Sequence, residues 1–217
     1  MKKRAALHNL GCKVNAYETE AMRQLLEEDG YEIVPFEPGA DVYVINTCTV
    51  TNIADRKSRQ MLHKARKMNP DAIVVAAGCY VETADGGVEK DPAIDIILGN
   101  NQKNQLVSVI RDFEQKRAGK RAEEPSGAMT KKIDINHTKE YENLIIDRTE
   151  NRTRADIKVQ DGCNQFCTYC IIPFARGRVR SRDTQDVLQE VRALAASGCQ
   201  EIVLTGIHLS SYGVDLG

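Results

Sequence analysis

Three cysteines stand close together in the stretch of residues 160–171, which reads QDGCNQFCTYCI. Cys163, Cys167 and Cys170 follow the spacing C-x3-C-x2-C, so their thiols can converge on one centre without help from the rest of the fold. Thiolates are the ligands that soft metals and iron–sulfur clusters prefer. Three thiolates on a four-iron cluster leave one iron free to bind a substrate or cofactor. The spacing therefore predicts an iron–sulfur site.

Two other interpretations of these cysteines stay open. A structural zinc ion takes four protein ligands from closely spaced pairs, but no second pair follows, and Cys199 and His208 are single residues far downstream. Disulfides or unrelated core cysteines are the other possibility, although cytosolic chains do not normally form such disulfides.

Three further cysteines each stand one or two residues beyond a predicted strand. The strands are expected at residues 4–10, 41–46 and 72–77, and the cysteines are Cys12, Cys48 and Cys79. In a parallel sheet the carboxyl ends of the strands lie on one edge, where open α/β folds place their ligands. Taken singly, each cysteine is more often a small buried hydrophobe. Their equivalent positions nevertheless favour a second three-thiolate cluster with its own open iron.

The elements that must position these cysteines alternate between strands and helices. One helix is expected to begin at Asn15, with Glu18 completing a capping box, and to end at Gly30. Two more helices are expected, from Thr51 or Asn52 to Met68 and over residues 102–115. A further strand is expected at 93–98. This alternation predicts an α/β fold with a parallel sheet covered on both faces. A second unit is expected to contain a strand at 155–160, a helix beginning at Asp183 or Thr184, and a strand at 201–205.

The segment between the two units is charged and rich in Gly, Pro and Ser, so residues 117–143 are predicted to be a linker. We accordingly expect one domain at 1–116 and the start of a second at 144–217. The second has too few strands to close a barrel, which suggests a fragment or a partner that supplies the rest.

The bulk composition sets limits on function. The net charge of −1 gives no global attraction to nucleic acid, so such a contact must be local. No apolar run is long enough for a membrane span and no signal peptide is expected, so seven cysteines indicate a reducing cytoplasm. A local candidate is the set Arg176, Arg178, Arg180 and Arg182, which alternate and so share one side of an extended segment. They could bind RNA phosphates or form a solvated strand. The basic residues 56–67 are open to the same two interpretations.

Five stretches of the chain resemble the methylthiotransferase family of radical S-adenosylmethionine (SAM) enzymes. They are Leu10–Met22, Asp41–Asn52, Gly78–Tyr80, Asp161–Arg182 and Glu201–Gly213. The resemblance covers nearly the whole chain but about half of the family's length. It implies a parallel-sheet methylthiotransferase domain, followed by the first strand–helix–strand of a radical SAM partial TIM barrel, without the family's C-terminal RNA-binding domain.

The resemblance also implies cofactors and a reaction. Cys12, Cys48 and Cys79 match the ligands of an auxiliary 4Fe-4S cluster, and the C-x3-C-x2-C loop matches those of the radical SAM cluster. Tyr169 matches the aromatic residue near the adenine of SAM, and Gly206 the strand end near its amino group. The implied reaction adds a 2-methylthio group to N6-threonylcarbamoyladenosine beside a tRNA anticodon, through a 5′-deoxyadenosyl radical, with an electron donor such as flavodoxin or ferredoxin.

Two alternatives to this reaction remain. A related enzyme would act on isopentenyladenosine in tRNA or on an aspartate of a ribosomal protein. A non-catalytic protein would carry iron–sulfur clusters or another metal. Because later barrel strands should complete the SAM pocket, residues 1–217 alone are expected to turn over weakly or not at all.

Overall fold

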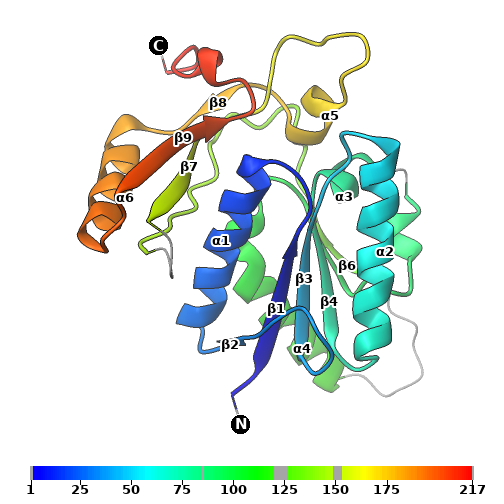
Figure 1. Ribbon diagram of the computed structural model, residues 1–217. Helices are drawn as coiled ribbons and strands as arrows, with labels where there is room; N and C mark the ends of the chain where they lie inside the picture. Colours follow the sequence, from blue (N-terminus) through cyan, green and yellow to red (C-terminus); the bar gives the residue numbers. More distant parts are fainter. Residues whose placement is uncertain (1, 85, 120–126, 149–152, 217) are drawn as a thin grey trace.

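The computed structural model describes residues 2–84, 86–119, 127–148 and 153–216. Its larger sheet has six strands, all parallel, in the order β2-β1-β3-β4-β5-β6 (Figure 1). The strands are β1 Arg4–Asn9, β2 Glu32–Ile33, β3 Val42–Thr47, β4 Ile73–Gly78, β5 Ile96–Leu98 and β6 Met129–Lys131. Every residue of β3 and β4 is buried, and most of them are apolar, as expected of parallel strands that are covered on both faces. The predicted parallel α/β sheet is confirmed.

Helices cover both faces of this sheet. The helices are α1 Lys13–Glu28, α2 Asn52–Met68, α3 Cys79–Thr83 and α4 Leu106–Gly119, with short 3-10 turns at Val88–Lys90 and Lys103–Gln105. On one face α1 and α4 bury residues such as Leu26 and Ile110 against Val44. On the other face α2 buries Leu62 against Ile45. Successive residues of β1, β3, β4 and β5 therefore belong to different cores, as the two-residue period of a strand requires.

A smaller sheet follows, in the order β8-β7-β9. Its elements are β7 Arg154–Asp161, α5 Ile172–Arg176, β8 Arg180–Ser181, α6 Thr184–Ala196 and β9 Glu201–Gly206, and a 3-10 turn at Leu209–Ser211 comes last. Strands β7 and β9 are parallel and are connected through α6, while β8 pairs antiparallel with the end of β7. The predicted strand–helix–strand unit is confirmed.

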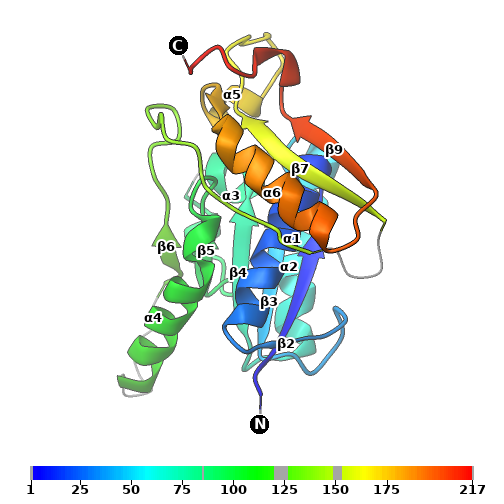
Figure 2. The same ribbon diagram turned by 90° about the vertical axis from the view of Figure 1, so that its left-hand side faces the viewer.

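Helix α1 lies between the two sheets (Figures 1 and 2). Its Met22 and Leu26 pack into a core of the large sheet. Tyr17 and Ala21, on another side of the same helix, pack with residues of β7 and α6, including Ile157. The helix thus holds the carboxyl ends of β1 and β7 in a fixed relation.

Three local predictions are wrong. Helix α1 begins at Lys13, with Cys12 as its N-cap residue, so Asn15 lies inside the helix and no capping box forms with Glu18. The predicted linker at 117–143 contains the end of α4 and strand β6, because Met129–Lys131 pairs with β5. Its residues 120–126 lie outside the described part of the chain. Pro173 and Gly177 predict a loop after Cys170, but Pro173 lies in the first turn of α5, a position that suits proline.

Candidate iron–sulfur edge

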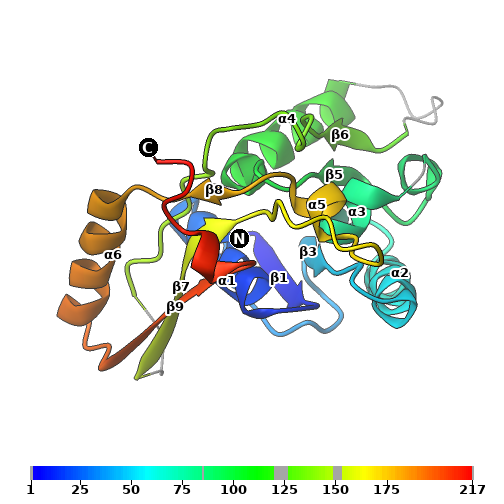
Figure 3. The same cartoon turned by 90° about the horizontal axis from the view of Figure 1, so that it is seen from above.

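The three early cysteines all lie at the carboxyl edge of the large sheet. Cys12 caps α1 just beyond β1, Cys48 directly follows β3, and Cys79 begins α3 after β4. The strands end at the same level, because Asn9 pairs with Asn46 and Thr47 pairs with Gly78. A Cβ added at Gly11 would lie 3.2 Å from the Cβ of Cys48. The topology therefore brings segments far apart in sequence to one place, which Figure 3 shows from above.

Neither set of cysteines forms a metal-binding arrangement in the part of the chain that the structure describes. Within the described ranges, no three His, Cys, Asp or Glu side chains are grouped closely enough to hold an ion. All seven cysteines are free thiols. The donor chemistry fits an iron–sulfur cluster at either place, and the convergence of each set of sulfurs on one cluster stays a prediction.

Asn15 connects this edge to the smaller sheet. Its side-chain Nδ2 donates to the backbone oxygens of Leu10, at 3.0 Å, and Thr47, at 2.9 Å, and so joins the ends of β1 and β3. Its Oδ1 accepts a 2.6 Å bond from Nη2 of Arg176 and lies 3.8 Å from the sulfur of Cys12. Sequence reasoning assigned Asn15 to a helix cap and missed this role.

The surroundings of Cys79 carry positive charge. Nδ2 of Asn100 lies 3.7 Å from its sulfur, and Nζ of Lys103 donates to Oδ1 of the same asparagine at 2.6 Å. Burial raises the pKa of the Cys79 thiol, the nearby Arg176 and Lys103 lower it, and Glu18, which pairs with both cations, raises it. Buried cations beside a buried thiol suit an anionic cluster, since they would stabilise its thiolate ligands.

The second set of cysteines lies on the loop between β7 and α5. Cys163 donates its backbone N–H to the oxygen of Gly177 at 3.0 Å, and Cys170 donates to the oxygen of Cys167 at 2.9 Å. Gly162 opens the loop with φ +71°, and a Cβ there would lie 1.8 Å from the backbone oxygen of Arg178. Only glycine fits at this position, because the returning chain passes directly against it.

Replacing Gly162 with alanine is therefore expected to lower the free energy of unfolding by more than about 2 kcal/mol, since the left-handed backbone alone costs about 1–2 kcal/mol. Gly30→Ala is a matched control, because Gly30 has φ +88° but no atom within 4 Å of an added Cβ. Urea unfolding of both variants gives the comparison. Equal losses would show that contact with Arg178 does not constrain the loop.

The two residues assigned to SAM lie near the same loop. The side chain of Tyr169 is 93% exposed. Gly206 ends β9, where an added Cβ would lie 2.8 Å from Oε1 of Gln160. That glutamine also donates to the backbone oxygen of Gly162 at 2.7 Å and accepts from the N–H of His208 at 2.8 Å. Contacts of Tyr169 and Gly206 with SAM stay predictions.

The four arginines do not share one exposed side, so this prediction is wrong. Arg176, Arg180 and Arg182 are fully buried and bind acidic or backbone groups within the chain. Arg178 alone is exposed. The segment does not run as one extended strand, because α5 and the turn at Gly177 interrupt it, and alternate residues then no longer point the same way.

Arg176 is the centre of a buried group of charges. Its guanidinium forms two bonds to Glu18, at 2.9 and 3.1 Å, and two to Asp161, at 3.1 Å each. Nζ of Lys158 also contacts both carboxylates, at 3.0 and 3.1 Å. Since Glu18 lies on α1 and the other three on or after β7, the group fastens the two sheets together.

The basic helix α2 keeps an exposed charged face. The exposed cations of this face are Arg56, Lys57, Arg59, Lys64 and Lys67. Arg66 is different, because it is half-buried and bonds to Asp95 at 2.5 Å. Contacts of these exposed cations with phosphate stay a prediction.

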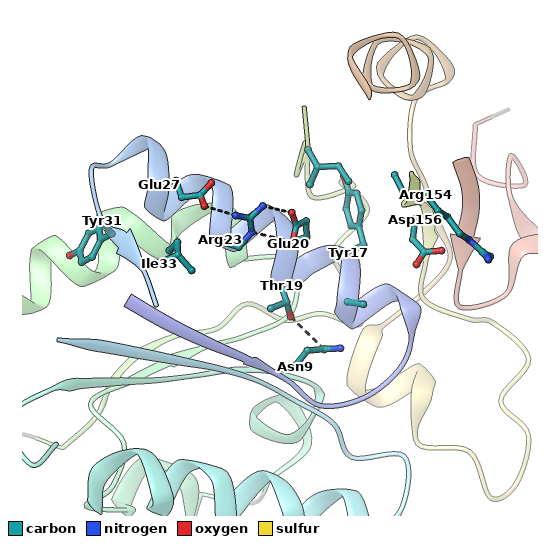
Figure 4. A pocket seen from close by; sticks show the side chains of 13 residues that line it. Asn9, Tyr17, Thr19, Glu20, Arg23, Glu27, Tyr31, Ile33, Arg154 and Asp156 are labelled. Atoms are coloured by element: carbon teal, nitrogen blue, oxygen red, sulfur yellow. Dashed lines mark hydrogen bonds and ion pairs between the residues drawn. The ribbon is translucent and has the colours of Figure 1, made fainter. Parts of the chain in front are cut away.

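A cleft of about 660 Å³ lies between α1, the edge of β1 and the start of β7 (Figure 4). Arg23 contacts Glu20 and Glu27 along its α1 wall, and Arg154 and Asp156 of β7 also line it. None of the predicted site residues lines the described part of this cleft. It is therefore separate from the cysteine edge.

Comparisons with known proteins agree with the division of the chain between two sheets. The model of the uncharacterized protein family UPF0004 matches residues 4–99, and that of the radical SAM superfamily matches residues 157–213. Among the helices of the described residues, none has the length and apolarity to cross a bilayer.

Several curated proteins are similar along the chain. The threonylcarbamoyladenosine tRNA methylthiotransferase MtaB of Bacillus subtilis is 45% identical over 97% of the chain and 45% of its own length. The protein of the same name from Aquifex aeolicus is 41% identical over 99% of the chain and 50% of its own length. The tRNA-2-methylthio-N(6)-dimethylallyladenosine synthase of Carboxydothermus hydrogenoformans is 33% identical over 95% of the chain and 46% of its own length. The chain spans about half the length of the curated relatives that it matches.

Proposed function

Because this chain belongs to the methylthiotransferase family of radical SAM enzymes, we propose that it binds the two iron–sulfur clusters of a tRNA methylthiotransferase. Its substrate would be N6-threonylcarbamoyladenosine beside the anticodon, to which a 2-methylthio group is added. The observation that carries the proposal is the pair of three-cysteine sets on neighbouring edges, joined by Asn15 and Arg176.

In this proposal each cysteine set holds one 4Fe-4S cluster. Cys12, Cys48 and Cys79 hold the auxiliary cluster, and the C-x3-C-x2-C loop holds the cluster that binds SAM. These groups would supply reductive SAM cleavage and a site for the sulfur to be transferred. The chain's own contribution is to position the thiolates, with Tyr169 and Gly206 beside the bound SAM.

The domain division is proposed with one change. The methylthiotransferase domain would extend beyond residue 116 to include β6, and the radical SAM domain would begin near residue 144. A cytoplasmic location and an electron donor such as flavodoxin or ferredoxin complete the proposal, because a reduced cluster requires both a reducing compartment and an electron source.

The test of the substrate is mass spectrometry of tRNA from cells that lack the gene. The expected result is loss of the 2-methylthio form of threonylcarbamoyladenosine, with the 2-methylthio form of isopentenyladenosine unchanged. Loss of the 2-methylthio form of isopentenyladenosine alone would favour that nucleoside as the substrate. No change in either nucleoside would reject a tRNA substrate. Anaerobic reconstitution separates the remaining alternative, because about eight irons per chain fit two clusters, whereas one bound zinc fits a non-catalytic metal protein.

A further inference from the structure

Two phenylalanines are exposed on and directly after the C-x3-C-x2-C loop. Phe166 immediately precedes Cys167 and is 38% exposed, and Phe174 lies on α5 and is 54% exposed. The other two phenylalanines of the chain, Phe36 and Phe113, pack against the two cores of the large sheet. The loop therefore presents to solvent the kind of side chain that the rest of this chain buries.

The exposed rings are held in a defined arrangement. The ring centroids of Phe166 and Phe174 lie 5.9 Å apart with the planes at 87°, an edge-to-face pair. The guanidinium carbon of Arg178 lies 4.2 Å from the centroid of Phe166, as in a cation–π contact. Phe166 has φ +47°, which is unfavourable for an aromatic residue. We call Phe166, Phe174 and Arg178 the aromatic platform.

Arg178 differs from the three arginines around it. Those three are buried and bind groups within the chain, whereas Arg178 is exposed and has no ion pair with a carboxylate in the described ranges. Its guanidinium keeps its donors available while one face lies on a ring. This combination is suited to binding a phosphate next to a stacked group.

The neighbouring surface is basic. The loop lies beside the N-terminal end of α2 in Figures 1 and 3. That end of α2 exposes Arg56, Lys57 and Arg59. The platform and these cations together match a polyanion that carries flat aromatic groups, which is the chemistry of single-stranded RNA.

We propose that the aromatic platform stacks an unpaired base of the tRNA anticodon loop, while Arg178 binds the adjoining phosphate. The inference rests on the proposed function and adds to it the surface that recognises the RNA. Since the platform is built on the cysteine loop itself, a base stacked there lies next to the cofactor that would act on the neighbouring nucleoside. A protein substrate would have no such need for an exposed stacking surface.

The test measures binding of an RNA stem-loop, carrying the anticodon-loop sequence of the substrate tRNA, to the anaerobically reconstituted chain. Phe174→Leu keeps an apolar side chain but removes the ring, and base stacking is worth about 1–3 kcal/mol. The expected loss of affinity is therefore roughly 5- to 150-fold. Phe174→Tyr should restore binding, because it restores the stacking face. Leu188→Ala, at an exposed leucine of α6, is the matched control and should bind as wild type does.

Two further readouts distinguish recognition from folding. Arg178→Gln should make the negative slope of the log association constant against log salt concentration shallower by about 0.7, which is the share of one phosphate contact on a single strand. Iron content and the cluster absorption spectrum should not change in any of these variants. Equal affinity of wild type and Phe174→Leu would overturn the platform alone. Failure of the wild-type chain, loaded with both clusters, to bind the RNA would also overturn the platform, whereas the tRNA substrate is rejected only by unchanged 2-methylthio nucleosides in tRNA from cells that lack the gene.

Discussion

Replacing Arg176 with methionine is expected to lower the free energy of unfolding by roughly 3–5 kcal/mol, because it leaves Glu18 and Asp161 buried without their main cation. Both carboxylates are almost completely buried and each receives two bonds from this guanidinium. A loss of that size is a large part of the stability of an ordinary domain.

Urea unfolding of wild type and variant measures this loss. Lys3→Met is the matched control, because the ion pair of Lys3 with Glu114 is on the surface and such pairs contribute about 0–1 kcal/mol. Arg176→Lys keeps the charge but not the planar fork, so an intermediate loss is expected. If Arg176→Met costs no more than the surface variant, the buried group does not fasten the sheets.

The same group makes stability depend on pH. Burial alone would raise the pKa of Glu18, but Arg176, Lys103 and Lys158 outweigh it and hold that pKa well below its ordinary value. The contribution of Glu18 is therefore complete above its unfolded pKa, about 4.3, and is lost as the pH falls through the lower folded value. The free energy of unfolding of wild type should therefore fall as the pH is lowered below about 4.3. In Glu18→Gln, measured by urea unfolding over the same pH range, the fall should be smaller, because the amide does not titrate.

Replacing Cys167 with alanine is expected to remove one cluster and leave the other. Iron should fall from about eight to about four per chain, because a four-iron cluster with two protein ligands is poorly held. Cys48→Ala should cause the same loss at the other edge. The measurements are iron and sulfide counts with the electron paramagnetic resonance spectrum of each reduced variant, which should differ between the two.

Cys199→Ala is the control for these substitutions. Cys199 lies in the turn before β9, where its sulfur is 3.2 Å from the backbone oxygen of Glu201, away from both sets of cysteines. Iron content should therefore be unchanged. A variant at Cys48 with full iron content would contradict the auxiliary cluster, whatever the result at Cys167.

Much of the fold could be predicted because it is local. Apolar runs of strand length and amphipathic helical stripes place every predicted helix and strand of the two sheets within a few residues of its bounds, as at β3 and α2. The helix that begins after Thr51 has the predicted cap, since the threonine side chain accepts from the N–H of Ala54. Strand β6 was missed because three residues, Met129–Lys131, carry too little pattern to stand out from a charged segment.

The arginines show why the remaining part could not be predicted. Alternation from Arg176 to Arg182 is compatible with a phosphate-binding strand and with buried ion pairs, and the partners that decide between them, Glu18 and Glu190, are distant in sequence or on another element. Asn15 and Glu18 are three residues apart and so share one face of α1. This spacing indicates that the two side chains have the same surroundings, but not which residues they contact.

By itself, the sequence determined which residues can serve as thiolate ligands, that three of them are closely spaced in one stretch, and that the other three follow parallel strands. Only the tertiary structure decided that α1 lies between the two sheets, so that Arg176 meets Asn15 and Glu18 and becomes buried, while Arg178 and the two phenylalanines stay at the surface. The physical reason is that ligand chemistry and strand period are properties of neighbouring residues, whereas the burial of a charge depends on which distant groups the packing brings to it.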